Sequence, residues 1–491
     1  MEDHNLDNLK LNKMQQAAYD KIMTGKSILL TGEAGTGKSV VIQKFMNDQK
    51  KYKRKEIGLT STTGASALII GGSTVHSFLG IGLGDGEIED LERRIASRKY
   101  VTERWRAIKV LIIDEVSMLS PILFDKLTEV AYLIRSGHSR SMLRKKKEYG
   151  WDGIQLVLTG DFCQLPVVKC EKYTFEAASW SDCIEETIIL DKNVRQTNDA
   201  TFQKILSDFR LGKVNEEQAK VLSDRVGKDI SVNGVEPTKL CAVNFQVRSI
   251  NEAALDELAL IAEENDEELE FIHFDMTQAN VGNIPDKIIQ KHKDQCIADE
   301  KLQLCVGAQV MLVKNEYAGE GEKRKLIYGN GSRGVVKDFT EEDWPIVEFT
   351  DGGVLTIVNH DFEIRGTPSK KDRKGKVEVV LTQIPLRVAY AISIHKSQGM
   401  TMDCVEVDLS RCFCAGHAYV ALSRVKSLKG LTLSKRFEMH NVKADPRCVE
   451  FYAHSTFEGG ATSSAGGRPD REAVAGQRQM KPRLTLIGGS G

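Results

Sequence analysis

The residues best suited to chemistry form one glycine-rich segment near the N-terminus, Gly32-Glu33-Ala34-Gly35-Thr36-Gly37-Lys38-Ser39. Residues 27–31 precede it as an apolar run that predicts a buried strand, and residues 40–46 predict a helix. Glycines between a strand and a helix let backbone N–H groups turn towards an anion, and the helix dipole adds to the attraction. The segment therefore predicts a phosphate-binding loop, with an ordinary glycine-rich turn as the alternative.

Two side chains of this loop are those that a nucleoside triphosphate requires. The Lys38 ammonium can reach the β- and γ-phosphates, and the Ser39 hydroxyl can hold Mg²⁺. The other positions that we expect to contact the nucleotide are Gly32, Ala34, Gly35, Thr36 and Gly37. The loop indicates a bound nucleotide, and by itself it does not select a reaction.

A glutamine upstream of the loop bears on the choice of nucleotide. Residues 11–19 predict the start of a helix, with Asn12 as a candidate N-cap. The Gln15 amide can pair with N6 and N7 of adenine, so Gln15 would select ATP over GTP. The alternative is an ordinary glutamine on the surface of a helix.

Two carboxylates and one amide follow predicted buried strands. Residues 109–115 predict a buried parallel strand that ends in Asp114 and Glu115, and residues 154–159 predict another buried strand, after which Gln164 follows. We expect Asp114 to hold the hydration shell of Mg²⁺ and Glu115 to orient and deprotonate the attacking water. Gln164 could sense the γ-phosphate. Solvated carboxylates and a proline-terminated loop are the alternatives.

Hydroxyl and aromatic groups follow another predicted strand, residues 57–60. Thr63, His76 and Phe78 lie after it, among several glycines. Such groups at the carboxyl end of a strand can contact a phosphodiester backbone or stack on a base. N-capping by Thr63 and turn formation by the glycines explain the same residues equally well.

Composition limits the class of protein. A chain of 491 residues with 41% hydrophobic and 28% charged residues predicts more than one soluble domain. The net charge of −1 gives no global basic field, so a surface that binds nucleic acid would need local basic patches. Candidate patches are residues 50–55, 144–147 and 370–376, and the alternative is that each of them is a solvated loop. Ten cysteines without a CxxC pair indicate free thiols. The N-terminus has no signal pattern, and no apolar run reaches membrane-spanning length.

Longer motifs resemble one known family. The segments Gly160–Pro166, Asn193–Gln196, Ala389–Thr401 and Ala418–Val425 resemble, in this order, the signature motifs of the PIF-type DNA helicases of superfamily 1B. The resemblance covers about residues 9–440. It implies an α/β fold of two RecA-like phosphate-loop domains in tandem, with a small inserted β-barrel.

The resemblance also implies where the domains lie. The first RecA-like domain is expected at 1–191, with a small wedge insertion at about 78–100. The second is expected at 192–322 and 379–456, interrupted by the β-barrel at 323–378, where short strand-like segments alternate with turns. Residues 457–491 are rich in Gly, Ala and Ser and predict a disordered tail.

The function implied by the resemblance is that of an ATP-driven motor that moves 5′ to 3′ on single-stranded DNA and unwinds duplex or structured DNA. Its cofactors would be ATP and Mg²⁺. Its partners would be single-stranded and forked DNA, and it would not bind a membrane. The protein would be intracellular and monomeric, and the formation of oligomers on DNA is left open. Arg195 and Arg424 match family positions that approach the γ-phosphate. The positions that match the DNA track of the family are Thr63, His76, His395 and Lys396.

His417 departs from the family pattern, because glutamine is usual at this position, and the departure bears on the coupling of ATP binding to DNA binding. A single-strand-stimulated ATPase or translocase without strong unwinding is an alternative function. An ATPase unrelated to nucleic acid is a third, against which the motifs of Arg195 and Arg424 argue. The nucleus, the mitochondrion and a viral replication site all remain open as the location.

Overall fold

The structure is a computed structural model that describes residues 10–48, 52–82, 84–136, 150–167, 170–282, 284–318, 325–365, 377–457 and 483–484. The chain divides into two compact units. The phosphate-loop unit comprises the described residues within Leu9–Thr62, Gly72–Lys192 and Asp445–Gly491. The second unit comprises the described residues within Thr63–Gly71 and Asn193–Ala444.

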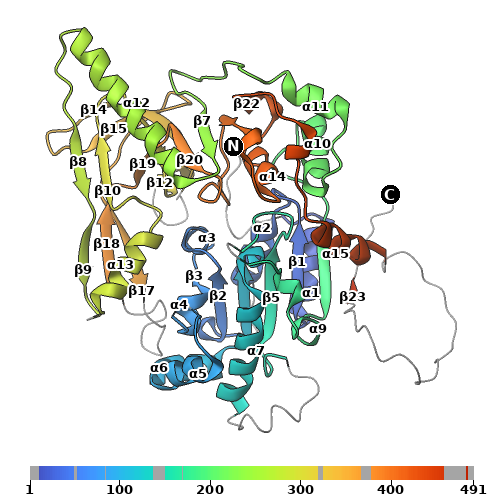
Figure 1. Ribbon diagram of the computed structural model, residues 1–491. Helices are drawn as coiled ribbons and strands as arrows, with labels where there is room; N and C mark the ends of the chain where they lie inside the picture. The colour runs from blue at the N-terminus through green and yellow to red at the C-terminus, as the bar shows by residue number, and fades with distance from the viewer. Residues whose placement is uncertain are drawn as a thin grey trace. The chain divides into compact units, whose positions relative to one another are not determined.

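The phosphate-loop unit is built on a parallel sheet of seven described strands in the order β23-β6-β1-β5-β4-β2-β3. Of these strands, β1, β2, β3, β5 and β23 are labelled in Figure 1. The central strands are buried along their whole length, as parallel strands with both faces covered must be. The strands are β1 (Ile28–Gly32), β2 (Ile57–Ser61), β3 (Ser73–Thr74), β4 (Val110–Asp114), β5 (Gln155–Gly160), β6 (Glu186–Leu190) and β23 (Arg483–Leu484).

Helices and aromatic side chains complete this unit. Trp105 stacks on Trp151 with ring centroids 6.0 Å apart, and Phe124 packs at a tilt against both Trp151 and Trp180. These buried rings belong to the same core cluster as Val116 and Phe162, which lie in the loops that follow β4 and β5. The helices are α1 (Lys13–Met23), α2 (Lys38–Asp48), α4 (Val75–Leu79), α5 (Ile88–Ala96), α6 (Lys99–Ala107), α7 (Pro121–Ser136), α9 (Trp180–Cys183) and α15 (Pro446–Phe457).

The C-terminal segment departs from the expected domain layout. The sequence predicts that residues 379–456 belong to the second RecA-like domain, whereas the structure assigns Asp445 and the described residues after it to the phosphate-loop unit. The reason is the apolar face of α15, whose Phe451 packs against Phe162 and Phe175. Within the predicted tail, β23 pairs in parallel with β6, so these two residues differ from the expectation of disorder. The other tail residues, 458–482 and 485–491, lie outside the described residues.

The second unit contains a parallel sheet of four described strands in the order β20-β7-β21-β22. All its strand pairs are parallel, which makes this part of the chain α/β as well. The strands are β7 (Thr238–Cys241), β20 (Ala391–Ser393), β21 (Val405–Val407) and β22 (Leu431–Leu433). The helices are α3 (Gly64–Ile69), α10 (Ala200–Leu211), α11 (Glu216–Ser223), α12 (Asn244–Glu264), α13 (Asp286–Gln295) and α14 (His417–Leu422).

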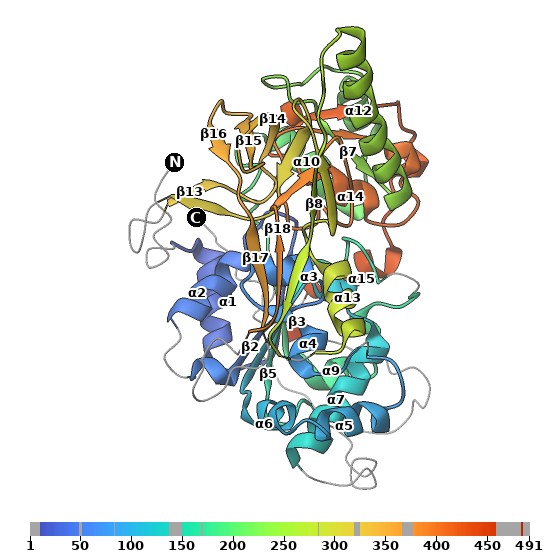
Figure 2. The same cartoon turned by 90° about the vertical axis from the view of Figure 1, so that its left-hand side faces the viewer.

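Antiparallel strands are inserted between β7 and β20, and β14, β15 and β16 lie next to one another in Figure 2. They span 272–388, well beyond the expected 323–378. The described strand pairs form sheets of five strands (β16-β15-β14-β11-β19), three strands (β17-β18-β9) and two strands (β10-β8 and β12-β13). No described pairing closes these sheets into a ring, so the β-barrel is not confirmed.

The bounds of these antiparallel strands are β8 (Ile272–Asp275), β9 (Thr277–Asn280), β10 (Lys301–Leu304), β11 (Gln309–Leu312), β12 (Glu316–Ala318), β13 (Lys325–Tyr328), β14 (Arg333–Phe339), β15 (Pro345–Phe349), β16 (Val354–Thr356), β17 (His360–Arg365), β18 (Val377–Gln383) and β19 (Leu386–Val388). Val310, Val336 and Val347 are buried in the core of the five-stranded sheet. The apolar positions that alternate along β14 and β15 thus supply its inner face.

Candidate active site

The phosphate loop connects β1 to α2, and its glycines have backbone angles that other residues rarely adopt. Gly35 and Gly37 have φ values of 83° and 81°, in the left-handed region. A Cβ atom at Gly32 would overlap the carbonyl oxygen of Leu190, at the end of the neighbouring strand β6. The sequence therefore needs glycine here for both the turn and the close packing of two strands.

The Lys38 ammonium is held against the loop. Its Nζ donates hydrogen bonds to the carbonyl oxygens of Gly32 at 2.8 Å and Glu33 at 2.9 Å. Lys38 and Ser39 begin α2, whose first-turn N–H groups have no partner within the helix itself. The ammonium and the helix N–H groups in this turn form a donor set that fits a phosphate group, and the Ser39 hydroxyl oxygen fits as a ligand of the accompanying cation.

Gln15 connects α1 to this loop. Its Nε2 donates to the carbonyl oxygen of Thr36 at 3.0 Å, and its Oε1 accepts from the backbone N–H of Asn12 at 3.0 Å. The side chain is 5% exposed, so the alternative of an ordinary surface glutamine is wrong. One amide proton and one oxygen lone pair are not used by these two bonds, and adenine recognition by Gln15 stays a prediction.

The carboxylate pair lies at the end of β4. Asp114 is 8% exposed, and its Oδ1 accepts a hydrogen bond from Thr159 Oγ1 on β5. Glu115 has a left-handed backbone, with φ 54° and ψ 46°. Such a conformation costs free energy for a residue with a side chain, and it is held here by a hydrogen bond from Thr62 Oγ1 to the Glu115 carbonyl at 2.8 Å.

The Gln164 turn begins where β5 ends. Gly160 has φ 153°, and a Cβ atom there would lie 2.9 Å from the backbone nitrogen of Val116. Glycine therefore lets β5 pass close to the turn that contains Glu115. The turn is tight, because the Gln164 N–H donates to the Asp161 carbonyl at 3.0 Å and the Cys163 N–H donates to Asp161 Oδ1 at 3.1 Å.

Strand order brings these groups to one edge of the sheet. The strand β5 lies between β1 and β4, and all three are parallel. Thr31 of β1 is opposite Gly160 of β5, and Ile113 of β4 is opposite Leu158. The phosphate loop, the Asp114–Glu115 pair and the Gln164 turn therefore leave the sheet at its carboxyl edge, where open α/β sheets bind ligands.

In the second unit, Arg195 and Arg424 meet at Ser423. Arg195 Nη1 donates to the Ser423 carbonyl at 2.9 Å, and Arg424 Nη2 donates to Ser423 Oγ at 2.7 Å. Arg424 is 2% exposed and also donates to the carbonyls of Val420 and Ser397. Without the family motifs, either arginine would more often form a surface ion pair, and the burial of Arg424 excludes that alternative for this residue.

The residues expected along a DNA track lie in both units. Thr63 Oγ1 accepts from the Ser66 N–H at 3.2 Å at the start of α3, in agreement with its capping interpretation, and His76 lies in α4. His395 packs edge-on against His417 with ring centroids 5.4 Å apart. Lys396 Nζ lies 4.0 Å from Asp299 Oδ1, and Asp299 also pairs with Arg387.

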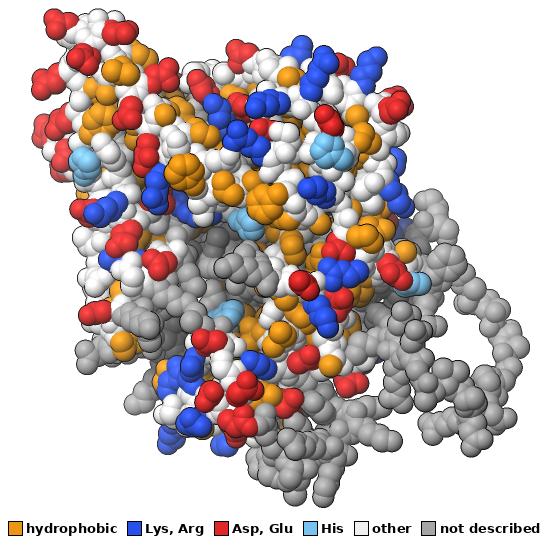
Figure 3. Space-filling model, viewed as in Figure 1, with side chains coloured by type: hydrophobic (Ala, Val, Ile, Leu, Met, Phe, Trp, Pro, Cys, Tyr) orange, Lys and Arg blue, Asp and Glu red, His pale blue; other side chains and the backbone are white. Residues whose placement is uncertain are grey.

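The distribution of acidic and basic side chains over the rest of the molecule limits where DNA could bind. Acidic side chains gather at the end of α12 and in the run that follows it, residues 263–270, which is mostly exposed (Figure 3). This end of the unit would repel phosphates. The basic runs at 144–147 and 370–376 and residues 50–51 of the first run lie outside the described residues.

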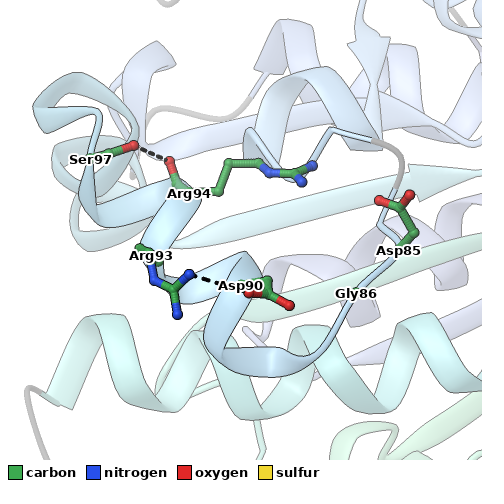
Figure 4. Close-up of a pocket in the computed structure, with 6 residues that line it drawn as sticks. All are labelled: Asp85, Gly86, Asp90, Arg93, Arg94 and Ser97. Carbon is green, nitrogen blue, oxygen red and sulfur yellow. Dashed lines mark hydrogen bonds and ion pairs between the residues drawn. The ribbon is translucent and has the colours of Figure 1, made fainter.

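The expected wedge region at 78–100 contains an open pocket of about 450 Å³ (Figure 4). Arg93 Nη1 lies 3.5 Å from Asp90 Oδ1, and Arg94 Nη1 donates to the Ile81 carbonyl at 2.8 Å. The pocket is lined by Asp85, Gly86, Asp90, Arg93, Arg94 and Ser97, none of which belongs to the phosphate-binding edge.

Two structural findings concern other kinds of site. Within the ranges that the structure describes, no cluster of three or more His, Cys, Asp and Glu side chains could hold a metal ion. None of the described helices has the length and apolar character needed to cross a membrane.

Sequence reasoning missed Thr159 and Tyr452, both of which contact the active-site edge. Thr159 could have been found, because it is the last residue before the Gly160–Pro166 motif and must lie beside the strand that ends in Asp114. Tyr452 has no such local signal, since its partners are remote in the sequence. Together these contacts describe a phosphate-loop ATPase of the α/β class.

Comparisons with known proteins agree with this class. A family model described as "PIF1-like helicase" matches residues 10–220. The chain is 36% identical over 482 residues to human "ATP-dependent DNA helicase PIF1", covering 97% of this chain and 68% of the human protein. It is 34% identical over 522 residues to "Uncharacterized protein 030L" of Invertebrate iridescent virus 6, covering 91% and 94% of the two chains.

Solved structures show the same relationship. The Pif1 helicase from Candida albicans matches with a TM-score of 0.70 and 32% identity, over 91% of this chain and 99% of that one. Bacteroides Pif1 bound to single-stranded DNA matches with a TM-score of 0.59 and 25% identity, over 91% and 97%.

The chain belongs to the PIF1-like helicase family, which confirms the resemblance seen in its motifs. Its two parallel-sheet units are the tandem RecA-like domains of the α/β fold. The enzyme class is that of an ATP-hydrolysing helicase, in agreement with the phosphate loop and the carboxylate pair at one sheet edge.

Proposed function

We propose that this chain is an ATP-dependent DNA helicase that moves 5′ to 3′ on single-stranded DNA and unwinds duplex or structured DNA. The observation that carries the proposal is the common edge of β1, β5 and β4, where Lys38, Glu115 and Gln164 follow adjacent parallel strands. Membership of the PIF1-like helicase family and the single-stranded DNA in a solved relative support DNA as the partner.

The phosphate loop would bind the triphosphate of ATP. Lys38 and the N–H groups that begin α2 neutralise the β- and γ-phosphates. The Ser39 hydroxyl and the Asp114 carboxylate would hold Mg²⁺, and Thr159 fixes the orientation of that carboxylate. When bound, Mg²⁺ would supply further neutralisation of phosphate charge.

Glu115 would act as the general base. Its carboxylate would orient the attacking water and accept its proton, and the left-handed backbone of Glu115 lies where the chain leaves β4. Gln164 would contact the γ-phosphate as an uncharged amide, and Gln15 would contact adenine.

Arg195 and Arg424 would stabilise the charge that develops on the phosphoryl oxygens. The support is their match to family motifs and their common attachment to Ser423, which would make them respond together. A planar guanidinium suits a charge spread over several oxygens.

DNA would bind through Thr63, His76, His395 and Lys396, with phosphate contacts and stacking in place of base-specific readout. A motor must accept every base, so its affinity for DNA should fall with salt and depend little on sequence. Both single-stranded and forked DNA are proposed as partners, with the protein acting as a monomer that can gather on DNA.

Strand displacement tests this proposal. Duplexes with a 5′ tail and with a 3′ tail of equal length are mixed with enzyme and ATP, and Lys38→Ala is the control for contaminating activity. We expect ATP-dependent displacement of the 5′-tailed duplex alone. Displacement from 3′ tails alone would overturn the polarity. DNA-stimulated ATP hydrolysis without any displacement would favour a translocase that does not unwind.

A further inference from the structure

The last long helix, α15, connects two parts of the phosphate-binding edge. Tyr452 is 5% exposed, and its hydroxyl lies 2.8 Å from Thr31 Oγ1 and 2.9 Å from the backbone nitrogen of Phe162. Thr31 directly precedes Gly32 of the phosphate loop, and Phe162 lies two residues before Gln164. One hydroxyl group therefore contacts both the strand that leads into the phosphate loop and the turn that carries Gln164.

The Tyr452 hydroxyl can accept one of these two hydrogen bonds and donate the other. The Phe162 N–H donates to the Tyr452 oxygen, and the Tyr452 O–H can then donate to Thr31 Oγ1. Thr31 is fully buried and lies opposite Gly160, so the bonds join the ends of adjacent strands. A phenylalanine at position 452 would fill the same space but leave a buried N–H without this acceptor.

Other contacts attach α15 independently of this hydroxyl. Cys448 Sγ lies 3.2 Å from the Phe162 carbonyl, and the Phe451 ring stacks on Phe175 with centroids 4.4 Å apart. Tyr173 donates to Asp445 Oδ2 at 3.0 Å, just before the helix begins. Because packing already holds α15 in place, the Tyr452 hydroxyl is not needed to dock the helix.

We propose that Tyr452 is a positioning residue for ATP hydrolysis. Its hydroxyl holds the Gln164 turn at a fixed position relative to the phosphate loop. This inference rests on the proposed hydrolysis of ATP at this edge. Without the hydroxyl, the Phe162 backbone in the Gln164 turn loses its tie through Tyr452 to Thr31, and only the pairing of β5 with β1 still fixes the start of the turn, so Gln164 is positioned less precisely for contact with the γ-phosphate. Binding of ATP by the loop N–H groups and Lys38 does not depend on this tie.

The test compares Tyr452→Phe with Glu450→Gln, an exposed position on the same helix. The measurements are kcat with saturating single-stranded DNA, the Kd for ATP, and the midpoint of thermal unfolding. We expect Tyr452→Phe to lower kcat about three- to tenfold, the equivalent of one lost hydrogen bond, with less than a twofold change in Kd. Glu450→Gln should match the parent. A proportional loss of folded protein, ATP binding and kcat would indicate a merely structural role and overturn the inference.

A second variant tests the route of the effect. Thr31→Val removes the other end of the same bond and keeps the branched shape of the side chain. If Tyr452 acts through Thr31, the double variant should be less impaired than the product of the two single effects. Full additivity would overturn the proposed tie to β1.

Failure of the inference is distinguishable from failure of the proposed function. An unchanged kcat in Tyr452→Phe, in a protein whose parent hydrolyses ATP, contradicts the positioning role alone. A parent chain without DNA-stimulated hydrolysis, or one whose hydrolysis survives in Lys38→Ala, contradicts the proposed function itself.

Discussion

Thr159 donates a hydrogen bond to the carboxylate of Asp114, and this bond joins the ends of the neighbouring parallel strands β5 and β4. Thr159 is fully buried, so its hydroxyl is shielded from water. A carboxylate that holds a cation works best when a neighbouring donor fixes its orientation. Thr159 is therefore as much a part of the expected Mg²⁺ site as the carboxylate itself.

The first prediction concerns this hydroxyl. Thr159→Val keeps the branched side chain and removes the donor, so we expect the Mg²⁺ concentration for half-maximal ATP hydrolysis to rise about three- to tenfold. Thr159→Ser, which retains a hydroxyl, should stay close to the parent. The measurement is kcat as a function of Mg²⁺ concentration at saturating ATP. Identical Mg²⁺ dependence in the two variants would show that the bond has no role in cation binding.

The second prediction separates the two carboxylates. Glu115→Gln should bind ATP and Mg²⁺ normally but lose at least about a hundredfold in kcat, because only the general base is removed. Asp114→Ala should weaken Mg²⁺-dependent ATP binding as well. Equilibrium binding of a fluorescent ATP analogue and steady-state hydrolysis distinguish the two cases. If Glu115→Gln hydrolysed ATP at the parent rate, another group would have to act as the base.

The third prediction concerns the arginines at Ser423. Arg195→Ala should lower kcat by a factor on the order of a thousand if Arg195 behaves as an arginine finger, with little change in ATP affinity. Arg195→Lys should not restore turnover, because one ammonium cannot reproduce a two-pronged contact. Arg424→Ala should lose turnover and also stability, since the Arg424 guanidinium makes three buried hydrogen bonds. Thermal unfolding and kcat are measured on the same preparations, and an unchanged kcat in Arg195→Ala would rule out the finger role.

The fourth prediction is a pH dependence of stability. His417 is fully buried, and neither ring nitrogen has a hydrogen-bond partner among the described residues. Burial, with a further contribution from His395, lowers the pKa of His417 from 6.5 to about 4. Below pH 6.5 the unfolded chain therefore binds a proton that the folded chain does not, and the free energy of unfolding falls as the pH drops towards 4.

The glutamine variant tests this directly. Between pH 7 and pH 5, the parent should lose about 1–2 kcal/mol more stability than His417→Gln. His395 titrates in both proteins, so its own effect largely cancels in the comparison. The measurement is the midpoint of thermal unfolding of each protein at each pH. Equal pH dependence in the two proteins would mean that His417 is not buried in its neutral form.

Local motifs made much of the phosphate-binding edge predictable. The glycine loop, the carboxylates after one buried run and the Gln164 turn after another are each encoded within about ten residues, and the parallel order of strands then brings them together. The positive φ of Glu115 and the close approach at Gly160 are not visible in the sequence, because they depend on which strand lies beside β4.

Long-range packing explains what could not be predicted. Tyr452 and Thr31 are 421 residues apart, and no local pattern indicates that α15 belongs to the phosphate-loop unit. The sequence predicts a smaller antiparallel region than the structure contains, because strands such as β11 and β19 are short and largely buried, and short buried runs do not show whether a strand is parallel or antiparallel. That the buried ring nitrogens of His417 have no hydrogen-bond partner among the described residues likewise could not be predicted, because it depends on which residues the fold brings near this side chain.

Displacement of streptavidin from a biotinylated oligonucleotide tests the claim of a directional motor most directly. The parent chain and Lys38→Ala are mixed with single strands that carry streptavidin at the 3′ end or at the 5′ end, with ATP and excess biotin. A 5′-to-3′ motor should accelerate release from the 3′ end only, and Lys38→Ala should accelerate neither. Release from the 5′ end alone, or release by Lys38→Ala at the parent rate, would contradict an ATP-driven 5′-to-3′ motor.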